Sequence, residues 1–145
     1  MYPLKFTPIL MERLWGGRGL EKFGRRLPED KKIGESWELS AVEGAVSRVK
    51  NGGLRGNNIN ELIEVYMGDL VGESVYDRFG EEFPLLIKFL DACEQLSVQV
   101  HPNDELAAER HDSFGKTEAW YGVDCKPGAA IYLGFKDLNT LKVKW

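Results

Sequence analysis

LSVQVHP, at residues 96–102, alternates apolar and polar side chains from one position to the next. Because side chains of a strand point to opposite faces with a period of two, Ser97, Gln99 and His101 are expected on one face. The apolar residues between them are expected to pack against a core. Pro102 has no N–H for a sheet ladder and is expected to end the strand. A polar row backed by an apolar row is what the inner wall of a small barrel needs if it holds a ligand or a metal.

GKTEAWY, at residues 115–121, repeats this alternation and places Glu118 and Trp120 on one face of a second strand. If the two strands line one cavity, Gln99, His101 and Glu118 converge. Imidazole and carboxylate groups are ordinary zinc ligands, an amide oxygen is a rarer one, and zinc is normally four-coordinate. The two strands therefore predict a zinc site for which they supply two good ligands and one weaker one.

These two motifs resemble those of type I mannose-6-phosphate isomerase, a family of zinc enzymes with a cupin (jelly-roll) fold. Further matching segments occur in the order that the family shows: LWGG at 14–17, GESWELS at 34–40 and FPLLIKFLD at 83–91. Together they run from about Pro3 to Phe135. The resemblance implies an enzyme that interconverts mannose 6-phosphate, a sugar phosphate, and fructose 6-phosphate, with one zinc ion per chain.

The resemblance also suggests roles for single residues. Lys116 lies two positions before Glu118, where the family has a lysine that lines the active site, and there it would transfer a proton as the catalytic acid/base. Trp15 would be a wall of the substrate cavity, and Ser97 would donate a hydrogen bond to sugar or phosphate oxygens. The alternatives are a solvent-facing Lys116, a Trp15 that fills the core and a Ser97 that only lines it.

The metal ligands have alternative interpretations too. His101 by itself would usually be a structural or surface residue, and the alternative for Glu118 is an exposed side chain or one paired with Lys116. His111, at the end of a short helix, is either a further ligand or a residue favoured there by the helix dipole. In the family the remaining histidine ligand lies on a later strand, so the site is expected to be incomplete within this chain.

The rest of the chain predicts a mainly β fold, a partial cupin-like jelly roll with a small helical insert around residues 60–80 and a short helix near 103–111. The helical insert is expected to begin at Glu61 with Asn60 as its cap, and Asn103 or Asp104 is expected to cap the second helix. Residues 12–26 are expected to form a loop. Strands are expected at 3–8, 33–40, 45–49, 83–91, 96–101, 117–123 and 129–135.

Composition narrows the class of protein. The 145 residues suffice for one domain with a core, and the net charge of -4 does not favour a nucleic-acid partner. No apolar run approaches the roughly 18 residues that a membrane helix needs, so no membrane association is expected. Cys93 and Cys125 form no CxxC motif, which is typical of reduced cysteines in a cytoplasmic protein.

Residues 136–145 do not resemble the family's continuation, so residues 1–145 are expected to be a single cupin-like domain that is the N-terminal half of a longer architecture. Half a jelly roll leaves open sheet edges, which predicts a homodimer or higher oligomer. Two functions follow. The chain is either an aldose–ketose isomerase or, alternatively, a truncated, non-catalytic cupin module that binds zinc or sugar phosphate weakly or not at all.

Overall fold

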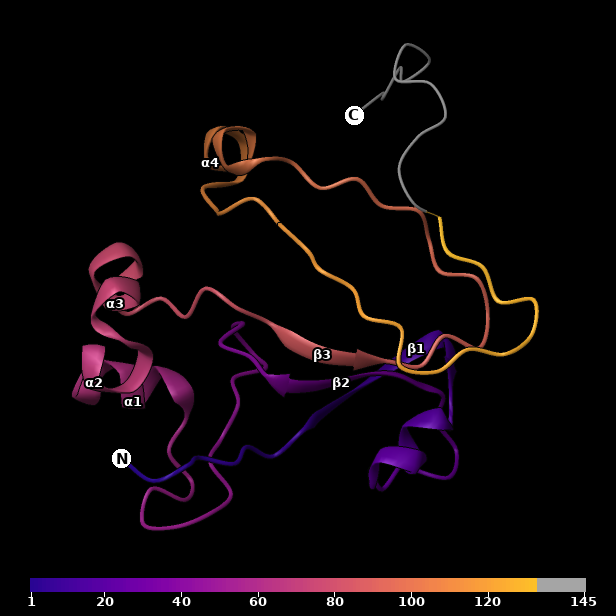
Figure 1. The fold of residues 1–145 in the computed structure, drawn as a ribbon, viewed down its shortest axis with the longest axis horizontal. Coiled ribbons are helices and arrows are strands. Elements are labelled where there is room, and N and C mark those ends of the chain that lie inside the picture. Colours follow the sequence, from indigo (N-terminus) through magenta and orange to yellow (C-terminus); the bar gives the residue numbers. More distant parts are fainter. Residues whose placement is uncertain (133–145) are drawn as a thin grey trace. The chain divides into compact units, whose positions relative to one another are not determined.

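The computed structural model describes residues 1–132, which form two compact units, Met1–Leu96 and a second that begins at Ser97. The first unit holds a small sheet, with three helices gathered at one end of it (Figure 1). The described part of the second unit holds one helix. The elements in chain order are β1 (Ile9–Gly17), the 3-10 helix η1 (Gly19–Phe23), β2 (Ile33–Leu39), α1 (Ile59–Tyr66), α2 (Gly68–Val71), α3 (Glu73–Phe79), β3 (Ile87–Leu90) and α4 (Asp104–His111).

The sheet is antiparallel in the order β1-β2-β3, so the predicted strand at 33–40 is its central member. The predicted loop at 12–26 is wrong, because β1 pairs with β2 from Ile9, opposite Trp37, to Gly17, opposite Ile33. Gly16 makes the close pairing possible, since a Cβ atom there would lie 2.4 Å from the backbone nitrogen of Gly34. The pairing depends on a segment about twenty residues away, which local sequence does not reveal.

β3 is shorter and more exposed than the predicted buried strand at 83–91. Among the described strands it pairs only with β2, and Ile87 is 50 % exposed. Pro84 lacks an N–H for a ladder, which agrees with a strand that begins only at Ile87. The predicted strands at 3–8 and 45–49 are reduced to isolated bridges, one of which joins Phe6 to Val49.

One buried carboxylate joins all three strands. Glu35 on β2 accepts hydrogen bonds from Arg13 of β1 (2.8 Å), from the indole N–H of Trp37 (2.9 Å) and from Lys88 of β3 (3.1 Å). Its side chain is only 8 % exposed, so the charge is compensated inside the fold rather than by water. The sheet therefore depends on an ionic cluster as well as on its ladder.

The apolar core of the first unit lies beside this sheet. Its buried residues are Leu20 of η1, Leu27 of the following loop and Ile33 of β2. Leu10 and Phe89 pack against them. Within the described residues, no helix is both long enough and apolar enough to cross a membrane.

The helical insert predicted around residues 60–80 is confirmed as α1, α2 and α3, but its cap is not Asn60. α1 begins two residues earlier, because the Asn58 side chain accepts the Glu61 N–H (2.9 Å) while the Glu61 carboxylate accepts the Asn58 N–H (2.8 Å). This reciprocal capping box satisfies two donors at the helix start, where a cap at Asn60 would satisfy fewer. The buried face of α1 consists of Ile59, Leu62 and Ile63.

Met67, between α1 and α2, has an unusual backbone conformation, with φ 46° and ψ -128°. Gly80, which ends α3, has nearly the same angles (φ 59°, ψ -128°), and there glycine relieves the steric conflict. Replacing Met67 with glycine should therefore stabilise the protein by about 1 kcal/mol, because relief of about 1–3 kcal/mol of strain exceeds the entropic cost of glycine. Urea denaturation followed by circular dichroism measures the change.

Val65→Gly is the matched control for Met67→Gly. Val65 is exposed in the last turn of α1, where glycine should cost about 1 kcal/mol or less. If both glycine variants lose stability equally, Met67 is not strained.

The second unit differs from the prediction in its strands and agrees with it in its helix. Asn103 caps α4 as predicted, accepting the Leu106 N–H at 3.0 Å. The segments predicted as strands at 96–101 and 117–123 are extended but form no ladder in the described chain (Figure 1). The apolar face expected to be buried is exposed, with Val98 66 % accessible. A strand needs a hydrogen-bonded neighbour, and in the described residues neither segment belongs to a sheet.

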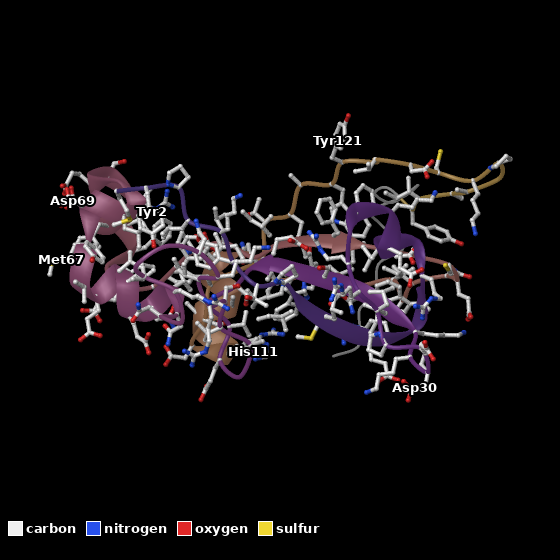
Figure 2. The ribbon with its side chains drawn as sticks, turned by 90° about the horizontal axis from the view of Figure 1, so that it is seen from below. Tyr2, Asp30, Met67, Asp69, His111 and Tyr121 are labelled. Carbon is white, nitrogen blue, oxygen red and sulfur yellow. The ribbon has the colours of Figure 1, made fainter. Side chains whose placement is uncertain are left out.

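The predicted strand at 129–135 extends beyond the described residues, as does the segment 136–145. Its described part, from Ala129 to Tyr132, follows a turn in which the Ala129 N–H donates to the Lys126 carbonyl at 3.0 Å. Tyr121 of the preceding segment projects from the chain with 88 % of its surface exposed (Figure 2).

Candidate metal centre

Three of the predicted site residues meet in the second unit. The ammonium nitrogen of Lys116 lies 3.0 Å from Glu118 Oε1 and 3.5 Å from His101 Nε2. His101 Nε2 is itself 3.9 Å from Glu118 Oε2. An imidazole, a carboxylate and an ammonium group therefore lie within 4 Å of one another, although 14 residues separate His101 from Lys116 in the sequence.

α4 and its flanking turns produce this meeting by returning the chain on itself. The Lys116 N–H donates to the Pro102 carbonyl (3.4 Å), and the Gly115 N–H donates to the Asp104 carboxylate (3.0 Å). Gly115 has no side chain to obstruct the approach, since a Cβ atom there would lie 2.6 Å from the Asn103 carbonyl carbon. The sequence suggested Asp104 as a possible cap. The hydrogen bond that its carboxylate accepts from the Gly115 N–H was not predicted.

His101 and Glu118 have the chemistry that zinc requires. Zinc binds imidazole nitrogen and carboxylate oxygen at about 2.0–2.2 Å, which places two such ligands on a tetrahedral ion about 3.4 Å apart. The observed separation of 3.9 Å is within a small side-chain adjustment of that spacing. Both side chains are about one-third exposed, which leaves them open to an ion and a substrate. The pair therefore fits a zinc ion.

The other predicted ligand and the predicted hydroxyl lie beside each other. The Gln99 amide nitrogen donates to Ser97 Oγ at 3.3 Å, and both residues are exposed. In the described part of the chain, no group of three or more His, Cys, Asp or Glu residues has the arrangement of a metal site. The described residues thus bring two donors together, and the ligand roles of His101, Glu118 and Gln99 stay predictions.

Trp15 and His111 occupy different settings. Trp15 is a half-buried residue of β1, and its ring lies against Gly34, where a Cβ atom would come within 2.7 Å of a ring carbon. That contact is a packing contact, and the substrate-binding role of Trp15 stays a prediction. His111 is exposed at the last position of α4, the place that the helix dipole favours for a histidine (Figure 2).

An apolar cavity of about 670 Å³ lies elsewhere, in the first unit. Its polar lining is limited to Asp69 and Tyr2, which Figure 2 places at the helical end of that unit. Its other lining residues are Met1, Leu4, Phe6, Leu39, Ile59, Leu70, Val71, Val75, Phe79, Phe83, Pro84 and Leu85. This lining provides no constellation for metal or proton chemistry.

Comparison with known proteins decides the family. A family model described as phosphomannose isomerase type I, catalytic domain, matches residues 4–142. The chain belongs to the type I phosphomannose isomerase family. The resemblance inferred from LSVQVHP and GKTEAWY is thus confirmed.

Relatives in this family are similar over most of the chain. Mannose-6-phosphate isomerase ManA of Bacillus subtilis (strain 168) is 44% identical over 133 residues, which are 91% of this chain and 40% of ManA. Probable mannose-6-phosphate isomerase GmuF of the same organism is 42% identical over 92% of this chain and 41% of its own length. The chain therefore spans about two fifths of the length of the curated phosphomannose isomerases that it matches.

Solved structures of phosphomannose isomerases have the same fold as the matched region. The crystal structure of the mannose 6-phosphate isomerase from Bacillus subtilis has a TM-score of 0.75 and 39% identity, over 87% of this chain and 39% of that chain. The crystal structure of a glutamate-to-alanine mutant of phosphomannose isomerase from Salmonella typhimurium has a TM-score of 0.62 and 30% identity, over 73% of this chain and 27% of that chain.

Proposed function

We propose that this chain carries the zinc-binding part of an aldose–ketose isomerase that interconverts mannose 6-phosphate and fructose 6-phosphate. The observation that supports the proposal is the cluster of His101, Lys116 and Glu118, whose nitrogen and oxygen atoms lie within 4 Å of one another. It occurs in a chain whose relatives are named mannose-6-phosphate isomerases at up to 44% identity.

In this proposal His101 and Glu118 hold the zinc ion, and Gln99 is a third, weaker ligand. Zinc, when bound, supplies a Lewis acid that polarises the sugar's carbonyl and hydroxyl oxygens. Lys116 Nζ moves the proton between C1 and C2 of the sugar, because it lies beside the two ligands where the sugar would bind. The Ser97 hydroxyl binds a sugar or phosphate oxygen, and Trp15 forms a wall of the cavity.

The spacing of these residues has a parallel in the Salmonella typhimurium enzyme. Solved mutants of that phosphomannose isomerase replace a lysine and a glutamate two positions beyond it, the same spacing as between Lys116 and Glu118. Other mutants replace histidines. That spacing supports the assignment of Lys116 and Glu118 to the reacting centre.

For the architecture, we propose that both units belong to one cupin-like jelly-roll domain and that the domain is the N-terminal part of a longer family architecture. The extended segments at 96–101 and 117–123, with exposed apolar residues such as Val98, would then be jelly-roll strands completed by further sheet. Within residues 1–132, no further strand pairs with the outer edge of β1 or of β3, which supports the proposed homodimer or higher oligomer.

A second candidate is a non-catalytic cupin module. One observation favours it: the described residues contain no group of three or more His, Cys, Asp or Glu side chains arranged to hold a metal ion. Such a module would bind zinc or sugar phosphate weakly or not at all.

A coupled assay of fructose 6-phosphate formation, with zinc content measured on the same sample, separates the two functions. The isomerase is expected to contain zinc in equimolar amount, to lose turnover with a chelator and to regain it with added zinc. A zinc-free protein without turnover, to which zinc restores nothing, supports the module instead.

A further inference from the structure

We propose that Lys116 acts as an internal cation that competes with the metal ion for His101 and Glu118. The inference rests on the proposed zinc site and adds a regulatory contact to it. The Lys116 ammonium lies 3.0 Å from Glu118 Oε1 and 3.5 Å from His101 Nε2, so it contacts both groups that would hold the metal.

The geometry brings the ammonium into contact with both donor groups. His101 Nε2 and Glu118 Oε2 are 3.9 Å apart, and a zinc ion bound to both would lie about 2.0–2.2 Å from each. The Lys116 nitrogen reaches the same imidazole nitrogen and the same carboxylate. Two cations cannot share these donors at contact distance, because they would repel each other and compete for the same lone pairs.

The backbone holds Lys116 close to this position. Its N–H donates to the Pro102 carbonyl, next to His101, and the neighbouring Gly115 is clamped by Asp104. The side chain has freely rotating bonds and is 44 % exposed, so it can turn away from the ligands without disturbing the backbone. Metal binding would thus exchange one cation for another and turn the lysine toward the substrate side of the site.

The competition predicts that removing the Lys116 charge strengthens zinc binding, although it removes the proposed acid/base. Replacing Lys116 with methionine, which is similar in size and uncharged, should abolish turnover but tighten zinc binding. We expect the zinc dissociation constant to fall by about tenfold or more, the effect of removing one close like charge and a competing donor contact. Isothermal titration of chelator-treated protein with zinc chloride measures this directly and needs no activity.

Two variants control for charge and for folding. Lys126→Met makes the same charge change at an exposed turn of the same unit. It should alter the zinc affinity less than twofold, which corresponds to a binding free energy change of about 0.4 kcal/mol or less. Lys116→Arg keeps a cation at the site and should not tighten zinc binding. Far-UV circular dichroism of each variant verifies that it is folded.

The zinc affinities of these variants and of His101→Ala test the competition and the zinc site separately. Tighter zinc binding by Lys116→Met alone supports the competition. Unchanged or weaker binding by Lys116→Met, when His101→Ala still loses zinc, overturns the competition and leaves the zinc site standing. Equal tightening by Lys116→Met and Lys126→Met also overturns it, because the effect is then one of net charge. Zinc binding that His101→Ala leaves unaffected overturns the proposed site and the competition together.

Discussion

Replacement of His101 by alanine is expected to weaken zinc binding by more than about a hundredfold. Loss of a residue that only orients a ligand typically costs about 10–100-fold in metal affinity, so loss of a ligand itself should cost more than about a hundredfold. At this site the described residues bring together two strong donors, the His101 imidazole and the Glu118 carboxylate. Isothermal titration with zinc, together with metal analysis of the purified protein, measures the change.

His111→Ala is the matched control, because it removes the same group from the chain's other histidine. His111 is exposed at the end of α4, and its replacement should leave zinc affinity within a few tenths of a kcal/mol of the wild type. If both variants lose zinc equally, both imidazoles are ligands. If neither loses it, the proposed metal centre is wrong.

Replacement of Glu35 by glutamine is expected to lower the free energy of unfolding by about 3 kcal/mol, the lower end of the range for breaking a buried ion pair. The variant leaves Arg13 of β1 and Lys88 of β3 without a counter-charge, although both are partly exposed. Urea denaturation at neutral pH measures the loss. Glu12→Gln is the control, because Glu12 on β1 forms an exposed ion pair with Lys31. Its loss should lower the free energy of unfolding by less than about 1 kcal/mol.

The stability that Glu35 contributes is expected to depend on pH. Burial raises the pKa of Glu35, but hydrogen bonds from Trp37 and Lys88 and the charges of Lys88 and Arg13 outweigh it, so that the pKa is lowered. The contribution of Glu35 is therefore fully present above about pH 4.5 and is lost as the pH falls through its folded-state pKa. The stability difference between wild type and Glu35→Gln should shrink in that acid range. A difference that stays constant with pH would contradict the ionic role.

Local signals in the sequence predicted several elements correctly. The capping propensity of Asn103 predicted the start of α4, and the helical insert at 60–80 appears as three helices. The strand predicted at 33–40 appears as β2, the central strand of the sheet. The predicted cap of α1 is wrong by two residues, because Asn58 and Asn60 are both good caps and only the reciprocal bond with Glu61 distinguishes them.

Non-local pairings were the elements that failed. The sequence of β1 is typical of a loop, because its two glycines and its arginine mask a strand that exists only through its pairing with β2. The alternation in LSVQVHP predicted a strand and a buried face, yet a strand requires a ladder partner and burial requires a covering layer. The described residues provide neither for Val98 and Val100, both of which are exposed.

The sequence by itself determined the family and the chemical types in the candidate site, because motifs and donor groups are properties of the residues in order. It also placed Lys116 and Glu118 on one face, since they are two positions apart. Only the tertiary structure brought the Lys116 ammonium into contact with both His101 and Glu118, and only it gathered Arg13 and Lys88 around Glu35. Those arrangements depend on how distant segments turn back and meet, and no local pattern encodes the resulting distances.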